Sequence, residues 1–522
     1  MAKNLILVIV GHQGYIRHIE DDADYASENE LLFDSISNTY LPLINLFYRL
    51  EAESVPFKVS LVLSPMLCAL FDDPMVQQQY IEWLDDRIAL GEKEIIRCKD
   101  DDSLCDNARS ILAQYKKDKA DFCDKYEQNL LKQFAEIAKN EHLELIATAA
   151  SYAYLPHYAD MPEVLNAQVE AGLYSHRRYF GAAPEGFWLP YLGYADDVEK
   201  VIRSYGINYT ILDTRSILFS KDSPADGIFS PVRCYNSLVV FGRDKDTPAD
   251  IVAEETGFMH NPLYKNLYKD IGFELDADAL GNCSASGKAR VATGYRYWSK
   301  QDTVYDKKAA LAQAEKDAKT FLDAKKTKLD AAEGLLNGND ASLVCAFDAA
   351  MLGQDWAEGM YFLEQVIRGS EGMTLSCGAD LIQNQFSLPK IKPYPSAASG
   401  TGYGEDLLDS SNGWMLRHTR KMCERMIDLA GRFPDDTGLK VRLLNLGAKE
   451  LMIAQCGDWA KMLHEGRYPE YVTERFKQCI ASFIAVFDSL GSNTVSTEWL
   501  TKIEREHPLF PWMNYRIFSK KK

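Results

Sequence analysis

Short apolar runs alternate along the chain with longer stretches in which apolar residues recur at helical spacing. The first run, Leu5–Val10, contains no polar residue and is typical of a strand buried on both faces. Further runs that are mostly apolar are Lys58–Leu63, Leu143–Ala147, Tyr209–Leu212, Leu238–Phe241 and Leu343–Phe347. Strands separated by helices predict β/α units and a mostly parallel sheet.

The helical patterns predict two regions outside such a sheet. Residues 75–141 hold two long polar patterns, the second near Ile111–Asn140, and we expect a helical excursion there. Residues 307–334 predict another charged, Ala-rich helix, whose ordinary role is a solvated face. Residues 387–405, rich in Pro, Ser and Gly, predict a linker or a binding loop. Amphipathic helices are predicted after it at Trp414–Gly431, Leu439–Glu465 and Glu470–Leu490.

We therefore expect an α/β domain over residues 1–385 and a C-terminal helical domain over residues 386–522. The length of 522 residues agrees with more than one domain. With 46% hydrophobic and 26% charged residues, the chain has an ordinary globular composition.

Charge and cysteine usage narrow the possible partners. The 76 acidic and 58 basic residues give a net charge of −18, and no basic stripe suggests a nucleic-acid groove. This balance suits a neutral ligand such as a sugar. No apolar run approaches the roughly 18 residues of a membrane span, so no membrane partner is expected. The eleven cysteines form no CxxC pair, which favours reduced thiols and a cytoplasmic location.

The segment AFDAAMLGQDWAEG, residues 346–359, carries the strongest chemical signal. Asp348 directly follows a predicted strand, and parallel barrels place their chemistry at the carboxyl ends of strands. Trp356 and Glu358 follow, and sugars stack on aromatic faces and bond to carboxylates. The alternative is that Asp348 caps the next helix, and the spacing alone leaves both interpretations open.

A metal site is a weaker hypothesis. His12, His18, Asp21 and Asp22 are suitable ligand types, but their spacing matches no standard metal motif. A pocket-lining or core histidine is the favoured interpretation, and we expect neither a metal nor a cofactor.

Several segments, in order along the chain, resemble glycoside hydrolase family 57 in its branching-enzyme-like branch. They are GHQGYIRH (11–18), SNTYLPL (37–43), GFWLPYLGY (186–194), FGRDKDT (241–247), YKDIGF (268–273), AFDAAMLGQDWAEGMYFLEQVIR (346–368), AKELMIAQCGDW (448–459) and FPWMNYRIF (510–518). The resemblance implies a (β/α)7 barrel with helical insertions and a C-terminal helical domain. It also implies retaining chemistry on α-1,4-glucans without a metal, which needs two carboxylates about 5–5.5 Å apart.

The family's catalytic pattern carries over incompletely. Asp348 matches the acid/base carboxylate, whereas Tyr191 stands where the nucleophilic Glu is expected. Val10 replaces the first His of the opening motif, and Tyr152 replaces a His of the second motif. In the fourth motif Ala350, Gln354 and Asp355 replace a Glu, a His and a Trp. The resemblance implies substrate contacts from His12, Tyr152, Trp188, Trp356, Asp458 and Trp459.

We therefore expect a protein that binds an α-1,4-glucan or maltooligosaccharide and has absent or weak transfer activity. One alternative is an active glucan branching enzyme, transferase or hydrolase in which Asp348 works with Glu144, Asp355 or Tyr191. Another is a metal-dependent sugar deacetylase that uses His12 and nearby acids. A phenol is a nucleophile in few glycosidases, and its pKa near ~10 demands an activating base.

Overall fold

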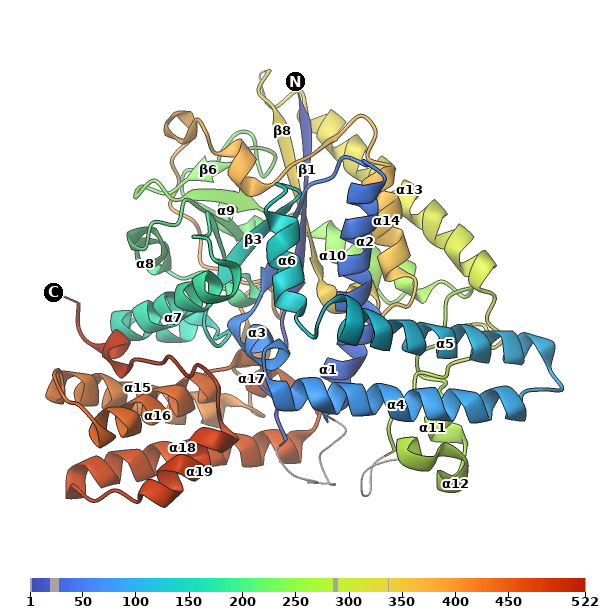
Figure 1. Ribbon diagram of the computed structural model, residues 1–522. Helices are drawn as coiled ribbons and strands as arrows, with labels where there is room; N and C mark the ends of the chain where they lie inside the picture. Colours follow the sequence, from blue (N-terminus) through green and yellow to red (C-terminus); the bar gives the residue numbers. More distant parts are fainter. Residues whose placement is uncertain (1, 19–27, 285–289, 337, 522) are drawn as a thin grey trace.

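The computed structural model describes residues 2–18, 28–284, 290–336 and 338–521. Asp21 and Asp22, two of the candidate metal ligands, lie outside the described residues. The predicted barrel occupies the middle of the molecule, with helices around it (Figure 1). The C-terminal helices lie together at one side, below the barrel in this view.

Parallel strands form the barrel. β1 (Lys3–Gly11) pairs with β2 (Val59–Leu63) on one side and β8 (Ala341–Asp348) on the other. The pairing continues through β3 (Leu143–Thr148), β4 (Gly186–Trp188), β5 (Tyr209–Leu212) and β7 (Val239–Gly242). A parallel bridge between Arg243 and Val344 joins the β7 end to β8 and closes the ring. The prediction of a (β/α)7 barrel is confirmed.

The sequence of β1 explains its central place. Ile6, Val8 and Val10 pack in the cluster that fills the barrel, and Leu5, Leu7 and Ile9 belong to the cluster shared with the helices. Both faces are buried, as expected for a continuous apolar strand in a parallel sheet.

Most strands lie where the apolar runs predict them. β4 has only three residues and was recognised in the sequence only as a polar and aromatic segment. Two short strands, β6 (Val232–Arg233) and β9 (Thr374–Leu375), were not predicted. The remaining barrel helices are α1 (Asn29–Ser35), α2 (Leu41–Ala52), α3 (Pro65–Phe71), α6 (Leu130–Ala138), α7 (Pro162–Phe180), α8 (Val198–Ser204), α9 (Thr214–Leu218), α10 (Asp246–Val252), α13 (Lys307–Ala332) and α14 (Gly359–Arg368).

The helical excursion is present, but its second half differs from the prediction. α4 (Pro74–Arg97) and α5 (Asp102–Ala120) extend away from the barrel, with the short α11 (Ile271–Glu274) and α12 (Ala277–Leu280) beneath them (Figure 1). The helix predicted over Ile111–Asn140 is interrupted, because Glu127 and Gln128 have positive φ angles. α6 then restarts at Leu130, capped by Asn129.

The C-terminal region contains α15 (Gly413–Arg432), α16 (Leu439–Ala454), α17 (Gly457–His464), α18 (Pro469–Ser492) and α19 (Thr497–Glu506). The single helix expected over Leu439–Glu465 is two helices, because the chain turns at Cys456, whose ψ is 124°. The Pro- and Ser-rich segment packs on the barrel mouth, where Ala398 N donates to Tyr191 O over 2.8 Å. The boundary near residues 385 and 386 stays a prediction. Among the described residues, no helix is long and apolar enough to cross a membrane.

Candidate active site

A cleft of about 510 Å³ opens at the carboxyl ends of the barrel strands, against α17 and the segment around Ser399. The predicted site residues that line it are His12, Tyr152, Trp188, Tyr191, Asp348 and Asp458. The fold therefore brings together residues from four strand ends and from a C-terminal helix that is far away in the sequence. A volume of this size is typical of a small-molecule site.

Asp348 is the last residue of β8 and opens onto the cleft. Its side chain caps no helix in the structure, so the capping alternative is wrong. Although the Asp348 side chain is exposed to the cleft, desolvation by the protein around the cleft base raises the pKa of the carboxyl above its ordinary value. The positive charges of Lys461 and Arg243 partly offset that effect. A carboxyl held toward its protonated form is suited to donating a proton.

A second carboxyl group, Asp355, lines the same cleft. Burial raises its pKa, and repulsion from Asp348 raises it further. The two acids therefore share one electrostatic environment, as pairs of catalytic carboxyl groups do.

Tyr191 presents a phenol at the end of β4. Its backbone is in the left-handed region, with φ 55° and ψ 17°, a conformation that L residues adopt at a cost. The hydroxyl has no hydrogen-bond partner among the described residues. Burial, with repulsion from the Asp458 carboxylate next, raises the pKa of the phenol well above its ordinary value. A neutral phenol without a base beside it is a poor nucleophile.

The Tyr191 ring fits only because residue 457 is glycine. A Cβ atom built on Gly457 meets the ring at 2.5 Å and the hydroxyl at 2.8 Å. The ring of Tyr152 packs edge-on against that of Tyr191, with centroids 5.3 Å apart. Two aromatic residues therefore occupy the part of the cleft between β3, β4 and α17.

His12 is held by contacts on three sides. Its Nδ1 lies 2.8 Å from Ser64 Oγ, and its Nε2 lies 2.5 Å from Asp458 Oδ2. The Tyr152 ring stacks on the imidazole at 3.7 Å with an interplanar angle of 16°. Tyr152 in turn accepts a hydrogen bond from Trp188 Nε1 over 3.2 Å. The rings of His12, Tyr152 and Trp188 therefore contact one another in sequence along one side of the cleft.

Asp458 is an ionised acceptor in this network. Burial opposes its ionisation, but the His12 charge, hydrogen bonds from His12 and Cys456, and Arg467 together lower the pKa to about 2. Cys456 Sγ donates to the same oxygen over 2.9 Å. Burial raises the pKa of the Cys456 thiol well above its ordinary value, so the sulfur remains protonated.

His12, Cys456 and Asp458 are also the group of described residues that could hold a metal ion, because their ligand atoms lie within 4.8 Å of one another. A metal would have to replace the hydrogen bonds between them. It would also have to displace the proton of the Cys456 thiol, whose pKa is raised. His18 does not join this group, and its ring lies against Tyr471 instead.

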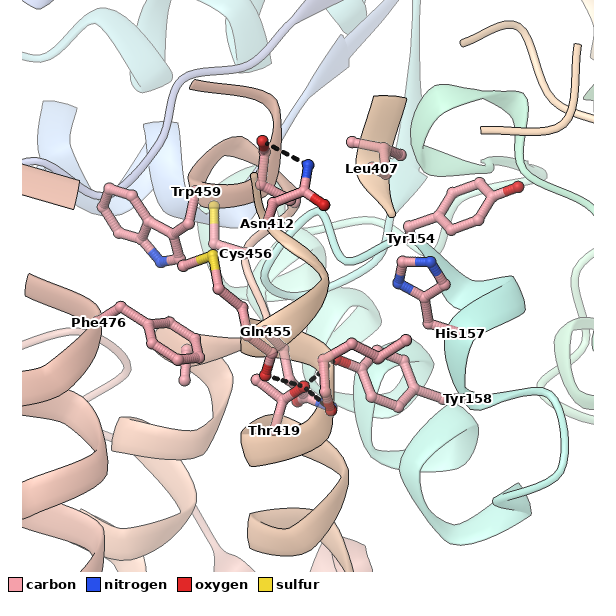
Figure 2. Close-up of a pocket in the computed structure, with 15 residues that line it drawn as sticks. Tyr154, His157, Tyr158, Leu407, Asn412, Thr419, Gln455, Cys456, Trp459 and Phe476 are labelled. Carbon is pink, nitrogen blue, oxygen red and sulfur yellow. Dashed lines mark hydrogen bonds between the residues drawn. The ribbon is translucent and has the colours of Figure 1, made fainter. Parts of the chain in front are cut away.

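Two predicted sugar contacts lie outside the cleft. Trp356 is 1% exposed and packs between Tyr264 and Phe362. Trp459, also 1% exposed, donates to Ile453 O and lines a separate cavity of about 40 Å³. Figure 2 shows this cavity, with Trp459 on one side and Tyr154 on the other. It has room for a few waters rather than a sugar ring. At 1% exposure, neither tryptophan presents a ring face on which a sugar could stack.

Glu144 is also remote from Asp348. Strand pairing links Asp348 through Val10 and Val62 to Ile146 on β3. Glu144 is two residues, about 7 Å, nearer the amino end of β3, and three strands away around the ring. It accepts from Ser60 Oγ over 3.0 Å, and it does not line the cleft.

Sequence reasoning missed three basic residues of the cleft: Arg243, Lys461 and Arg467. Arg243 directly follows β7, and this place at a strand end could have marked it as a site residue. In the structure it pairs with Asp213 over 3.0 Å. Lys461 lies 5.9 Å from the Tyr191 ring centroid. Neither Lys461 nor Arg467 has a local signal, because α17, which carries Lys461, and the turn after it, which carries Arg467, reach the cleft only through tertiary packing.

Comparisons with known proteins find similarity over most of the chain. Residues 6–318 match the family model described as glycosyl hydrolase family 57. Residues 418–518 match the model of the 1,4-alpha-glucan branching enzyme C-terminal region. A 1,4-alpha-glucan branching enzyme of Thermococcus kodakarensis is 22% identical over 512 residues, which cover 91% of this chain and 72% of that protein.

Solved structures show the same fold over the whole chain. The alpha-amylase AmyC of Thermotoga maritima superposes with a TM-score of 0.92 and 26% identity, covering 100% of both chains. A branching enzyme of Pyrococcus horikoshii superposes with a TM-score of 0.88 and 20% identity, covering 100% of this chain and 98% of that one. These similarities extend through the C-terminal helices as well as the barrel.

Proposed function

The chain belongs to glycosyl hydrolase family 57, and from this premise we propose that it binds α-1,4-glucan in the cleft with absent or weak glycosyl transfer. The observation that carries the proposal is Tyr191, a buried phenol without a hydrogen-bond partner, in the same cleft as Asp348. On this proposal the cleft binds glucan but lacks an effective nucleophile for glycosyl transfer.

Glucan binding is supported by the lining of the cleft. The partly exposed rings of His12 and Tyr191 offer surface on which sugars pack, and Tyr152 and Trp188, which are 6% and 5% exposed, pack beside them. Asp348, Asp355 and Arg243 supply acceptors and donors for hydroxyl groups. We also propose a cytoplasmic location, supported by eleven cysteines that are all free thiols.

Weak transfer follows from the chemistry that Tyr191 would have to perform. A retaining reaction needs a nucleophile at the sugar carbon while Asp348 protonates the leaving oxygen. The phenol would first have to lose its proton, and the nearby Asp458 carboxylate disfavours the phenolate. The loss of an activated nucleophile commonly lowers kcat by several orders of magnitude.

A second candidate is an active glucan hydrolase or transferase that pairs Asp348 with Asp355. Both carboxyl groups line the cleft, and the Asp348 charge is close enough to raise the pKa of Asp355, after the larger effect of burial. In that arrangement one ionised carboxyl group would take the proton of the attacking water or sugar hydroxyl, while the other, protonated, would give its proton to the leaving oxygen.

Isothermal titration with maltoheptaose tests the binding proposal. We expect heat of binding with wild type, and at least tenfold weaker binding at the cleft for Ala350→Trp, which places an indole in the cleft lining. Ala120→Trp, on the exposed end of α5 and outside the cleft, is the matched control. No heat at millimolar sugar, or equal binding by all three proteins, would count against glucan recognition by the cleft.

A further inference from the structure

A second and larger hollow lies on the side of the barrel. It has a volume of about 820 Å³ and is bordered by α2, by α5, by residues between 265 and 311, and by residues 353–360. We call it the α5 groove. Within the described residues, none lines both the α5 groove and the cleft.

One wall of the α5 groove contains an unsatisfied carboxylate. Glu358 is 1% exposed, and its Oε1 accepts from Tyr305 OH over 2.7 Å and from Lys265 N over 3.2 Å. Its Oε2 has no hydrogen-bond partner among the described residues. A buried carboxylate oxygen without a donor is costly, so a ligand that donates here gains free energy.

An unpaired amine lies beside this carboxylate. Within the described part of the chain, the Lys265 side chain makes no ion pair and no hydrogen bond, and its Nζ lies 4.7 Å from the Tyr305 ring centroid. Burial lowers the pKa of this amine to about 8, although the Glu358 charge acts in the opposite direction. The wall therefore offers a donor and an acceptor next to each other.

This pair fits a neutral polyhydroxylated ligand. One hydroxyl of a sugar can donate to Glu358 while another accepts from Lys265. A phosphate or carboxylate would gain from Lys265 but would meet the negative charge of Glu358. Asn38, Asn107 and Gln114 add amide groups along the groove, and its volume suits several sugar units.

A short segment joins the α5 groove to the cleft. Asp355 lines the cleft, and Glu358, three residues later, lines the groove. Gly353 lets this segment approach the backbone just before α2 closely, because a Cβ atom there would meet Asn38 O at 1.7 Å. A ligand in the groove would therefore contact the segment that holds an acid of the cleft.

We propose that the α5 groove is a second carbohydrate-binding site, which holds α-glucan outside the cleft through Glu358 and Lys265. The choice of α-glucan as ligand rests on the proposed function.

The test uses maltoheptaose titration of the full chain with the cleft blocked by Ala350→Trp. We expect remaining binding, weakened at least tenfold by Ser110→Trp, which fills the groove from an exposed position on α5, and by Lys265→Met. Ala120→Trp on the same helix is the control and should leave this binding unchanged. Thermal unfolding of each variant confirms that it is folded.

Two results would overturn the inference: no binding once the cleft is blocked, or residual binding that neither groove variant weakens. The proposed function fails separately. If Ala350→Trp leaves wild-type binding intact while the groove variants remove it, the cleft is not the glucan site and the groove is.

Discussion

His12 Nε2 and Asp458 Oδ2 lie 2.5 Å apart although 446 positions separate them in the chain. This contact joins the end of β1 to the first turn of α17, so the barrel and the C-terminal helices build the cleft together. Cys456 donates to the same carboxylate oxygen, and Ser64 lies beside the other imidazole nitrogen. The cleft therefore depends on both parts of the chain being folded.

Replacing Asp458 should cost stability in a way that depends on pH. Its pKa of about 2 is below the ordinary value of about 3.9, so ionised Asp458 stabilises the fold above that ordinary value. The contribution, about 2–3 kcal/mol, should be lost as pH falls from about 4 to about 2. Denaturant unfolding of wild type and Asp458→Asn should differ at pH 7 and converge near pH 2. A difference that is constant with pH would contradict this account.

Asp348→Asn should have the opposite effect. The pKa of Asp348 is raised by burial, so its ionised form opposes folding and the opposition appears as pH rises above the ordinary value. The variant should therefore have a higher Tm than wild type at pH 7 and an equal Tm below about pH 4. A lower Tm at pH 7 would mean that neighbouring groups stabilise the Asp348 charge more than desolvation destabilises it.

Gly457→Ala tests the contact between α17 and the Tyr191 ring. The added Cβ would come within 2.5 Å of that ring, and overpacking of this kind costs about 1–3 kcal/mol. Tyr191→Ala should remove the clash, so the double variant should recover most of the loss. A double-mutant cycle by denaturant unfolding measures this coupling, and strictly additive effects would show that the two residues are not in contact.

Chelation tests the metal-dependent alternative. His12, Cys456 and Asp458 are linked by hydrogen bonds that need no ion, so dialysis against EDTA should leave maltoheptaose affinity unchanged. Affinity or hydrolytic activity that is lost with EDTA and restored by Zn²⁺ would favour the deacetylase-like hypothesis.

Much of the barrel could be predicted because β1 and β8 are continuous apolar strands, buried over nearly their whole length. β4 lacked such a signal, since only Gly186–Trp188 pairs before the chain turns at Pro190. The break between α16 and α17 has a local cue in Gly457 and Asp458, which suit the start of a helix. That cue was weaker than the apolar periodicity on both sides of it.

The residues of the candidate site also fall into two groups: those that a local sequence pattern predicts and those that only tertiary packing places. Asp348 could be placed because it directly follows a strand in a barrel. Trp356 and Trp459 have the right chemistry for sugar stacking, yet neighbouring aromatic and helical residues bury them, and only tertiary packing decides that. Lys461 on α17 and Arg467 in the turn after it reach the cleft through tertiary packing, which no local pattern encodes.

The most direct test of the central claim is a transfer assay with amylose, in which new branch points and new reducing ends are counted for wild type and for Asp348→Asn. If Tyr191 cannot act as a nucleophile, both proteins should show the same background rate, even at enzyme concentrations near that of the substrate. A wild-type rate well above background that Asp348→Asn abolishes would contradict the account and show a working catalytic pair in the cleft.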